Sequence, residues 1–273
     1  MRHNQGRITS RDRRSSIAVY RFELVAAGYF LLLALAATRV PAAGQRTARG
    51  AAASVAAASA AVVASRALPD DARFWLAHLY LVLGYWIPSL LTAQAGESRF
   101  EAWLRQSDSA WRSYVPPLTP VAAACLELAY LACYVVVPVA FVTVWSYGTS
   151  SQVDRFWTAV LLSGFACYMS LPWLVSRPPR MFDQPRMPQN GVASFNVSVL
   201  RRVSHQFNTF PSGHVAVAIA VSLSVMPVSP AAASVFGAIA AGIAIGAAVG
   251  RYHYGIDVLI GALVGVAGAL VAG

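Results

Sequence analysis

The sequence contains no lysine, although its formal net charge at pH 7 is +10. All 21 of its cationic side chains are therefore arginines, which stand against 11 acidic residues. A basic excess often marks a nucleic-acid-binding protein, which gathers its cations in one patch or along one helix. Here the arginines lie in the N-terminal segment and in short stretches between apolar runs. That distribution argues against a nucleic-acid partner and is typical of the loops of membrane proteins.

Cysteine and charge are also scarce. The three cysteines, Cys125, Cys133 and Cys167, fall inside apolar segments, and an odd number in such segments argues against a disulfide framework and a zinc site. Only 12% of the residues are charged, whereas 57% are hydrophobic. Since a helix needs about 20 mostly apolar residues to cross a membrane, this composition excludes a soluble domain and predicts a membrane protein surrounded by lipid.

The apolar runs predict an all-α, polytopic membrane bundle, because backbone groups in lipid must be satisfied within their own segment. Six strong runs follow residue 70, at 74–95, 120–146, 156–175, 213–228, 231–250 and 254–272. Two weaker runs precede them, at 18–38 and 50–65. We therefore expect a disordered basic tail (1–16), an N-terminal two-helix membrane hairpin (17–69) and a six-helix core (70–273).

Residues 97–113 differ from these runs. Phe100, Trp103, Leu104 and Trp111 recur there at helical spacing, with arginines and an aspartate between them. This pattern predicts an amphipathic helix that lies in the membrane interface and does not cross it.

The arginine-rich tail predicts a cytoplasmic N-terminus. With eight spans, the polar segments at 96–119, 176–210 and 251–253 then all face the other side of the membrane. We expect an integral protein of a bacterial cell membrane, with any site formed by these segments open to the extracytoplasmic side.

Three polar clusters meet at this predicted face and together suit a phosphate group. Arg177 and Arg180, three residues apart, end one span, and guanidinium groups fit tetrahedral oxyanions. Ser212 and Gly213 precede the next apolar run, where Ser212 is a natural N-cap and the backbone N–H groups offer an anion site. Arg251 belongs to the third cluster. We expect these five residues to bind a substrate phosphate.

The third cluster, GRYHYGID at 250–257, also supplies a candidate nucleophile. His253 and Asp257 are four residues apart, so a helix places the carboxylate beside the imidazole. Such a carboxylate fixes the tautomer and stabilises the cation that forms when the other ring nitrogen attacks. Neutral imidazole can attack phosphorus directly, and His214 is then available to protonate the leaving oxygen. The acidic residues are too scattered for two-metal chemistry, so the sequence predicts neither a metal site nor a cofactor.

In order and spacing, these clusters resemble the type 2 phosphatidic acid phosphatase (lipid phosphate phosphatase) superfamily. Its pattern is Lys-x6-Arg-Pro, then Pro-Ser-Gly-His, then Ser-Arg-x5-His-x3-Asp, and the matching stretches here are RP at 177–178, PSGH at 211–214 and HYGID at 253–257. The resemblance covers about 74–272. It implies a phosphohistidine on His253, with Asp257 as its orienting group and His214 as general acid.

Two departures from this pattern bear on the substrate. The family's lysine falls at Ser170, and its Ser-Arg falls at Gly246 and Ala247. Arg251 is shifted by four residues, about one helical turn, so its long side chain is expected to reach much the same place. The RYHY-x-x-D form resembles the branch that contains inositol phosphorylceramide synthases, which transfer a phosphoryl-alcohol group instead of hydrolysing it.

Three functions follow as hypotheses. The first is a metal-independent lipid phosphate phosphatase that acts on a lipid mono- or diphosphate. The second is a phosphotransferase that uses the same residues with a polyol acceptor. The third is a non-enzymatic membrane transporter or flippase that retains an anion site.

Other polar residues carry weaker signals. Glu127 lies within the run 120–146, where facing lipid would cost about 2.5–3.5 kcal/mol, so we expect it to face the bundle and form hydrogen bonds. Arg201 and Arg202 suit a contact with a lipid headgroup and a solvated loop equally well.

Overall fold

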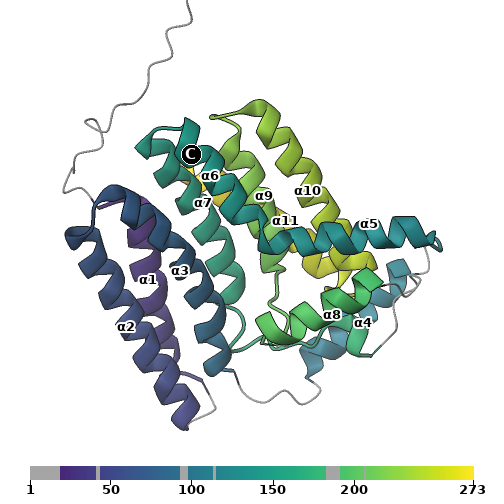
Figure 1. Cartoon of the computed structure of the whole chain (residues 1–273). Coiled ribbons are helices and arrows are strands. Elements are labelled where there is room, and N and C mark those ends of the chain that lie inside the picture. The colour runs from purple at the N-terminus through teal and green to yellow at the C-terminus, as the bar shows by residue number, and fades with distance from the viewer. Residues whose placement is uncertain (1–18, 41–43, 93–97, 113–114, 183–190, 206) are drawn as a thin grey trace, which may run out of the picture.

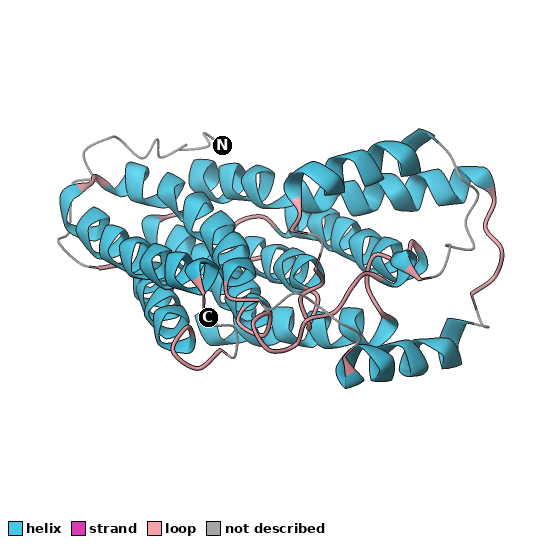
Figure 2. Ribbon diagram, turned by 90° about the horizontal axis from the view of Figure 1, so that it is seen from below, coloured by secondary structure: helices cyan, strands magenta, loops and turns pink. Residues whose placement is uncertain are grey.

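The computed structural model describes residues 19–40, 44–92, 98–112, 115–182, 191–205 and 207–273 (Figure 1). Within these ranges every regular element is a helix (Figure 2), apart from one isolated bridge between Ser176 and Asn208. The all-α prediction is confirmed. The predicted tail, residues 1–16, lies outside the described residues.

The helices occur at the positions of the predicted runs, with one addition and one break that are described below. In chain order they are α1 (Arg21–Ala36), α2 (Gln45–Ala67), α3 (Asp70–Leu90), α4 (Arg99–Arg112), α5 (Pro120–Leu131), η1 (Ala132–Tyr134), α6 (Val136–Tyr147), α7 (Ser150–Tyr168), η2 (Pro179–Met181), α8 (Gly191–Val203), α9 (Gly213–Val225), α10 (Pro230–Val249) and α11 (Gly255–Ala272).

The two N-terminal helices pack against the rest of the chain. α1 contacts α2, α3 and α7, and its buried residues share one apolar cluster with those of the later helices. Charged side chains add to this packing. Glu23 of α1 accepts hydrogen bonds from Arg73 of α3 at 2.7 and 2.5 Å, and Arg21 Nε donates to Asp154 of α7 at 3.0 Å. The N-terminal hairpin is therefore held by ion pairs as well as by apolar contacts.

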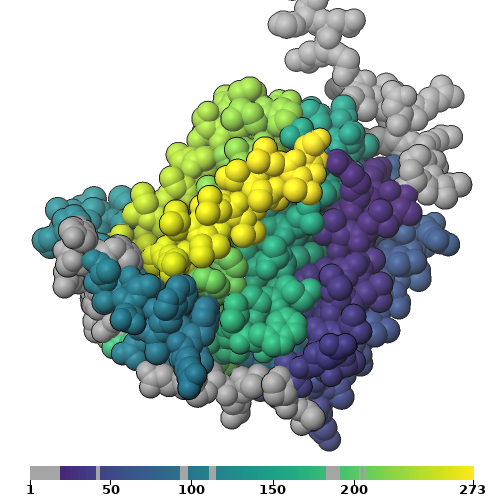
Figure 3. All heavy atoms as spheres, turned by 180° about the vertical axis from the view of Figure 1, so that it is seen from behind, coloured from purple at the N-terminus to yellow at the C-terminus, as the bar shows by residue number. Residues whose placement is uncertain are grey.

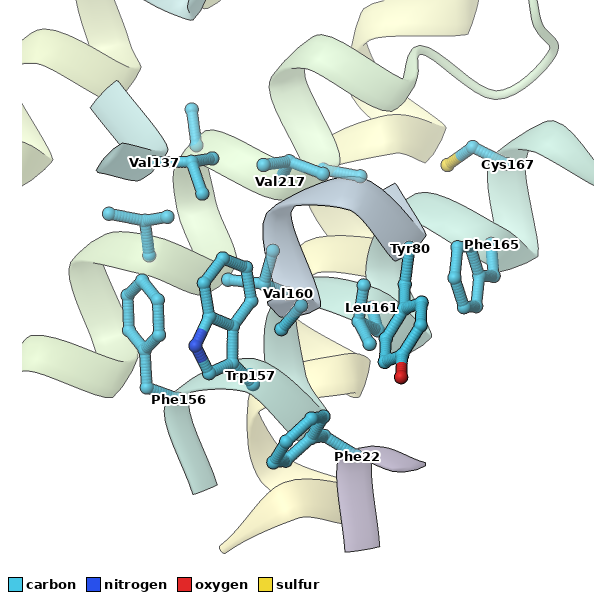
Figure 4. Packing of buried hydrophobic residues seen from close by; sticks show 14 of the residues in the cluster. Phe22, Tyr80, Val137, Phe156, Trp157, Val160, Leu161, Phe165, Cys167 and Val217 are labelled. Carbon is cyan, nitrogen blue, oxygen red and sulfur yellow. The ribbon is translucent and has the colours of Figure 1, made fainter. Parts of the chain in front are cut away.

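α7 lies in the centre of the bundle, between α1, α3, α9 and α11. Figure 4 shows its Phe156 and Trp157 close to Phe22 of α1, with Tyr80 of α3 nearby. Phe156 and Trp157 are both fully buried. Since lipid is as apolar as these side chains, close packing and not water exclusion is what holds helices together in a membrane. This aromatic core therefore fixes α7, whose C-terminal end leads into the site.

The predicted span 120–146 is broken at η1, where α5 and α6 meet at an angle of 57°. Pro138 supplies the physical reason, because a proline has no N–H and its ring clashes with the carbonyl four residues earlier, here that of Tyr134. The chain therefore cannot run as one straight helix from α5 into α6, and it bends at η1.

Three described helices are long and apolar enough to cross a membrane alone, namely α2, α10 and α11. The bent pair α5 and α6 forms a fourth candidate if it counts as one span, and α9 is apolar but short. These candidate spans indicate an integral membrane protein. The total of eight spans and their orientation stay predictions.

The predicted polar loop 176–210 contains a helix that was not expected. α8 turns Ala193 and Asn196 inward against α5, both at most 4% exposed, while Phe195 is 60% exposed. The inward face carries small and polar side chains, so apolar periodicity did not reveal it. α4 and α8 both lie at the end of the bundle away from the C-terminus (Figure 1).

α4 is helical as predicted, but its inner face is acidic. Glu101, Leu104 and Asp108 are all at most 2% exposed, whereas Trp103 is 45% exposed. Viewed from behind, α4 (blue) lies beside the start of α11 (yellow), which it contacts (Figure 3). Asp108 was expected among the polar residues of an interfacial helix. It is buried because it bonds to the loop before α11, as described below.

Candidate active site

The loop between α10 and α11 carries His253. The backbone N–H of His253 donates to the carbonyl of Ala247 at 3.0 Å, which ties the loop to the last turn of α10. Its Nδ1 lies 2.7 Å from Oδ2 of Asp257, and both residues are at most 3% exposed. The expected contact is present, but it is not made along one helix, because His253 lies in the loop and α11 begins at Gly255. With Nδ1 engaged, Nε2 is the nitrogen available to a reacting group.

His214, in the first turn of α9, faces the same space as His253. The centroids of the two rings are 5.8 Å apart. Both residues line a cavity of about 380 Å³, here called the polar cavity, which lies where the loops at 178–181 and 207–209 meet α8. Two imidazoles on different elements therefore line one cavity.

Arg180 also lines the polar cavity. Its guanidinium lies over the ring of Tyr252, 4.1 Å from the centroid, and its backbone N–H donates to the carbonyl of Arg251 at 3.0 Å. Among the described residues its buried Nη1 has no hydrogen-bond partner. An unsatisfied buried donor costs about 1–3 kcal/mol, and more when charged. Phosphate binding by Arg180 stays a prediction.

Several wall residues of the polar cavity were missed or left open by sequence reasoning. The polar ones are Arg201, Ser204, Asn208, Thr209 and Tyr252. Arg201 was treated as equally suited to a headgroup contact and to a solvated loop, and the structure places it on the cavity wall. Asn208 and Thr209 lie three and two residues before Pro211, the first residue of the PSGH stretch, so their position near a motif was the signal available.

Arg177 does not line the polar cavity. Its guanidinium donates to Glu101 at 3.1 and 2.6 Å, and its backbone N–H donates to the same carboxylate at 2.8 Å. Burial raises the pKa of Glu101, but the hydrogen bonds and charge of Arg177 outweigh that effect, and the net pKa is lowered. Phosphate binding by Arg177 stays a prediction that requires this pair to open.

Arg251 also points elsewhere. Its φ of 63° lies in the left-handed region and turns the chain just after α10. Its Nη1 pairs with Asp108 of α4, and its side chain lines a separate cavity of about 340 Å³ together with Arg105 and Phe182. Its side chain therefore reaches α4 and a different cavity from the one that His253 lines. Its role toward phosphate stays a prediction.

Ser212 stands at the N-cap of α9 as expected, but its side chain makes no capping hydrogen bond. The backbone N–H of Ser212 donates to the carbonyl of Asp257 at 3.2 Å, and that of Gly213 donates to the hydroxyl of Thr209 at 3.2 Å. Both amides are therefore engaged inside the protein. A side chain at position 213 would meet the ring of Tyr168 at 2.4 Å, so glycine permits this close packing. Phosphate binding by either residue stays a prediction.

An apolar cavity of about 440 Å³ adjoins the polar one. Aliphatic and aromatic side chains of α3, α6 and α9 supply most of its wall, and the break at η1 contributes Cys133 and Tyr134. His214 and Tyr85 line both cavities. The site therefore joins a polar space around two histidines to an apolar space among helices.

Glu127 faces the bundle and is hydrogen-bonded, as predicted. Its Oε2 accepts from Nδ2 of Asn196 at 2.6 Å and from the hydroxyl of Tyr252 at 2.5 Å. The ring of Tyr252 stacks on Tyr130, with centroids 3.9 Å apart. The guanidinium of Arg180 lies over the same ring of Tyr252. Glu127 thus holds the aromatic ring on which the cavity's guanidinium rests.

A scan against protein-family models matches residues 98–271 to the PAP2 superfamily. The chain belongs to the PAP2 superfamily. The match runs from α4 almost to the end of α11 and includes every predicted site residue. It begins later than the resemblance seen in the sequence, so α3 lies outside it. It is a match to the superfamily and shows no particular kinship with the inositol phosphorylceramide synthase branch. The search of curated proteins and the search of solved structures returned no match.

Proposed function

We propose that this PAP2 superfamily membrane protein is a lipid phosphate phosphatase that acts through a phosphohistidine on His253. One observation carries the proposal: His253, His214 and Arg180 line a single polar cavity that adjoins an apolar cavity at His214 and Tyr85. A phosphate in the first cavity and a hydrocarbon chain in the second would belong to one lipid molecule.

In the first step, Nε2 of His253 attacks phosphorus and the bond from phosphorus to the lipid oxygen breaks. The leaving oxygen takes a proton from His214, so the lipid departs as a neutral alcohol. Asp257 holds the proton on Nδ1 of His253 and stabilises the positive charge on the ring. Arg180 stabilises the equatorial oxygens, which is the role guanidinium groups play in phosphoryl transfer.

In the second step, water replaces the lipid alcohol. His214, now neutral, accepts a proton from this water as its oxygen bonds to phosphorus, and the bond from phosphorus to Nε2 breaks. Inorganic phosphate leaves and His253 returns to its starting state. Every proton in this scheme passes through His214, and Arg180 supplies the positive charge that faces the phosphate oxygens.

A phosphotransferase is the second candidate. The polar cavity extends beyond the histidines to the neutral hydroxyl and amide groups of Ser204, Asn208 and Thr209, which could hold a polyol in the place of water. The same phosphohistidine chemistry would then end in transfer. A transporter with a retained anion site is the third, and it needs no bond to form on His253.

Product analysis separates the three candidates. The purified protein in lipid vesicles receives ³²P-labelled phosphatidic acid or a labelled polyprenyl diphosphate, with and without added inositol or glycerol. Release of labelled inorganic phosphate that depends on His253 supports the phosphatase, and label in a new polyol ester supports the transferase. Movement of intact lipid that survives His253→Ala would contradict both enzymes.

A further inference from the structure

Two buried acids on α4 bind the loops that carry the site. Glu101 and Asp108 are seven residues apart, about two helical turns, and are 1% and 2% exposed. Each carboxylate accepts from a guanidinium and also from a backbone N–H, which belongs to Arg177 for Glu101 and to Gly255, the first residue of α11, for Asp108. Burying a charged pair is costly unless its remaining hydrogen-bonding positions are also filled. Here the additional backbone bonds help to fill them.

Asp108 binds the loop of the nucleophile on both sides of His253. Its Oδ2 pairs with Nη1 of Arg251, two residues before the histidine. Its Oδ1 accepts from the backbone N–H of Gly255, two residues after it, at 3.0 Å. One carboxylate therefore joins both ends of a five-residue segment with the imidazole at its centre.

Glu101 binds the neighbouring loop in the same way. It accepts from the backbone N–H and the guanidinium of Arg177, three residues before the cavity's Arg180. The carbonyl of Ser176 accepts from the backbone N–H of Asn208 at 2.8 Å, which joins this loop to the segment before α9. The inner face of α4 thus contacts the loops that supply both the nucleophile and the cationic group.

We propose that Asp108, assisted by Glu101, is a positioning residue that sets the place of His253 relative to His214 and Arg180. This inference rests on the proposed function, since it assigns α4 a part in the same reaction. Neither acid lines the polar cavity, so both act through the residues they hold. A displacement of about 1 Å in a reacting group can lower a rate by about 100-fold. Loss of the bonds that Asp108 makes to the loop should therefore lower kcat more than it changes substrate binding.

A matched control exists at the other end of the molecule. Asp154, 8% exposed, also accepts from a guanidinium, that of Arg21 at 3.0 Å, and from a backbone N–H, that of Phe22 at 3.2 Å. It lies 14 residues before the last residue of α7, Tyr168, which is about 21 Å along the helix axis. Asp154→Asn therefore removes the same kind of bond far from the site.

The test compares Asp108→Asn with Asp154→Asn in the same vesicles, by lipid phosphate turnover and by hydrogen–deuterium exchange. For Asp108→Asn we expect kcat to fall about 10- to 100-fold, with KM within about 2-fold, and faster exchange over 250–257. Asp154→Asn should lower thermal stability and speed exchange near Arg21, with kcat within about 3-fold of wild type. Glu101→Gln serves as a second variant if Asp108→Asn does not fold, with faster exchange expected over 175–182 and a smaller fall in kcat.

Equal losses of kcat in Asp108→Asn and Asp154→Asn would overturn the proposal, and so would unchanged exchange over 250–257. If wild type hydrolyses no lipid phosphate, the proposed function fails while the exchange data still decide whether α4 holds the loop.

Discussion

Arg73 is a buried arginine and Arg180 a half-buried one, and their surroundings differ. Arg73 donates through Nε and Nη2 to Glu23 and through Nη1 to Asp70, and it is 3% exposed. Arg180 forms no ion pair with any described residue, and its Nη1 has no partner among them. The first guanidinium is fully used by the protein, whereas the second has hydrogen-bonding capacity left for a ligand.

The two ends of α11 also differ in how their charged groups are used. Near its last residues, Arg21 bonds to Asp154 and to the carbonyl of Ala272, which closes a structural network. At its start, Asp257 is bonded to His253, which lies on the wall of the polar cavity. An 18-residue helix separates these ends by about 27 Å. Charge that is neutralised internally stabilises the fold, and charge that faces a cavity is available for chemistry.

The largest expected contrast is between Arg180→Gln and Arg73→Gln in turnover. Loss of the cavity guanidinium should lower kcat/KM about 100- to 1,000-fold, as loss of one preorganised donor does in other enzymes, with little change in unfolding temperature. Phosphate release from labelled lipid and a thermal unfolding scan in detergent measure both quantities. A loss in Arg180→Gln that followed its unfolding temperature would remove the distinction between the two arginines.

Arg73→Gln should instead lower stability. It leaves the buried carboxylates of Glu23 and Asp70 without their cation, and breaking a buried pair costs about 3–5 kcal/mol. Unfolding of the purified protein in detergent measures the change, and Arg73→Gln that does fold should retain near-normal kcat. Normal stability in this variant would contradict the structural role given to the Arg73 cluster.

Tyr252→Phe tests how Arg180 is held. The variant keeps the ring beneath the guanidinium but removes the 2.5 Å hydrogen bond to Glu127. Leaving that buried acceptor with one bond fewer should cost about 1–3 kcal/mol of stability. Tyr252→Leu, which also removes the ring, should lower kcat further than Tyr252→Phe does, and equal kcat values would show that the ring does not place Arg180.

The smallest effect concerns pH and the pair of Glu101 with Arg177. Because the folded pKa of Glu101 is lowered, its stabilising contribution is complete above the ordinary value of 4.5 and is lost as pH falls through the folded value. The difference in unfolding temperature between wild type and Glu101→Gln should therefore shrink from about pH 7 to about pH 3. A difference that is the same at both pH values would mean that Glu101 is not ionised in the folded protein.

Local spacing explains what sequence reasoning predicted well. Apolar runs gave rise to helices because lipid-facing backbone must be satisfied within its segment. The spacing also predicted the contact between His253 and Asp257, although His253 lies in the loop two residues before α11 and only Asp257 is on the helix. Arg177 and Arg180 could not be told apart in this way, since they lie three residues apart in one loop. Their difference depends on Glu101, 76 residues from Arg177, and Arg251 depends likewise on Asp108, 143 residues away. Which residues pair over such sequence distances depends on how the helices pack, and local spacing does not reveal it.

The central claim is that phosphorus bonds transiently to His253. Rapid acid-free quenching of the protein with ³²P-labelled lipid phosphate, followed by denaturing electrophoresis, would trap the intermediate. The control is His205, whose ring stacks on Tyr85 at 4.3 Å between centroids but does not line the polar cavity. We predict label that is stable in base and lost in acid, present in wild type and in His205→Gln, and absent from His253→Ala. Undiminished label in His253→Ala, or turnover of the lipid phosphate by that variant at the wild-type rate, would contradict the account.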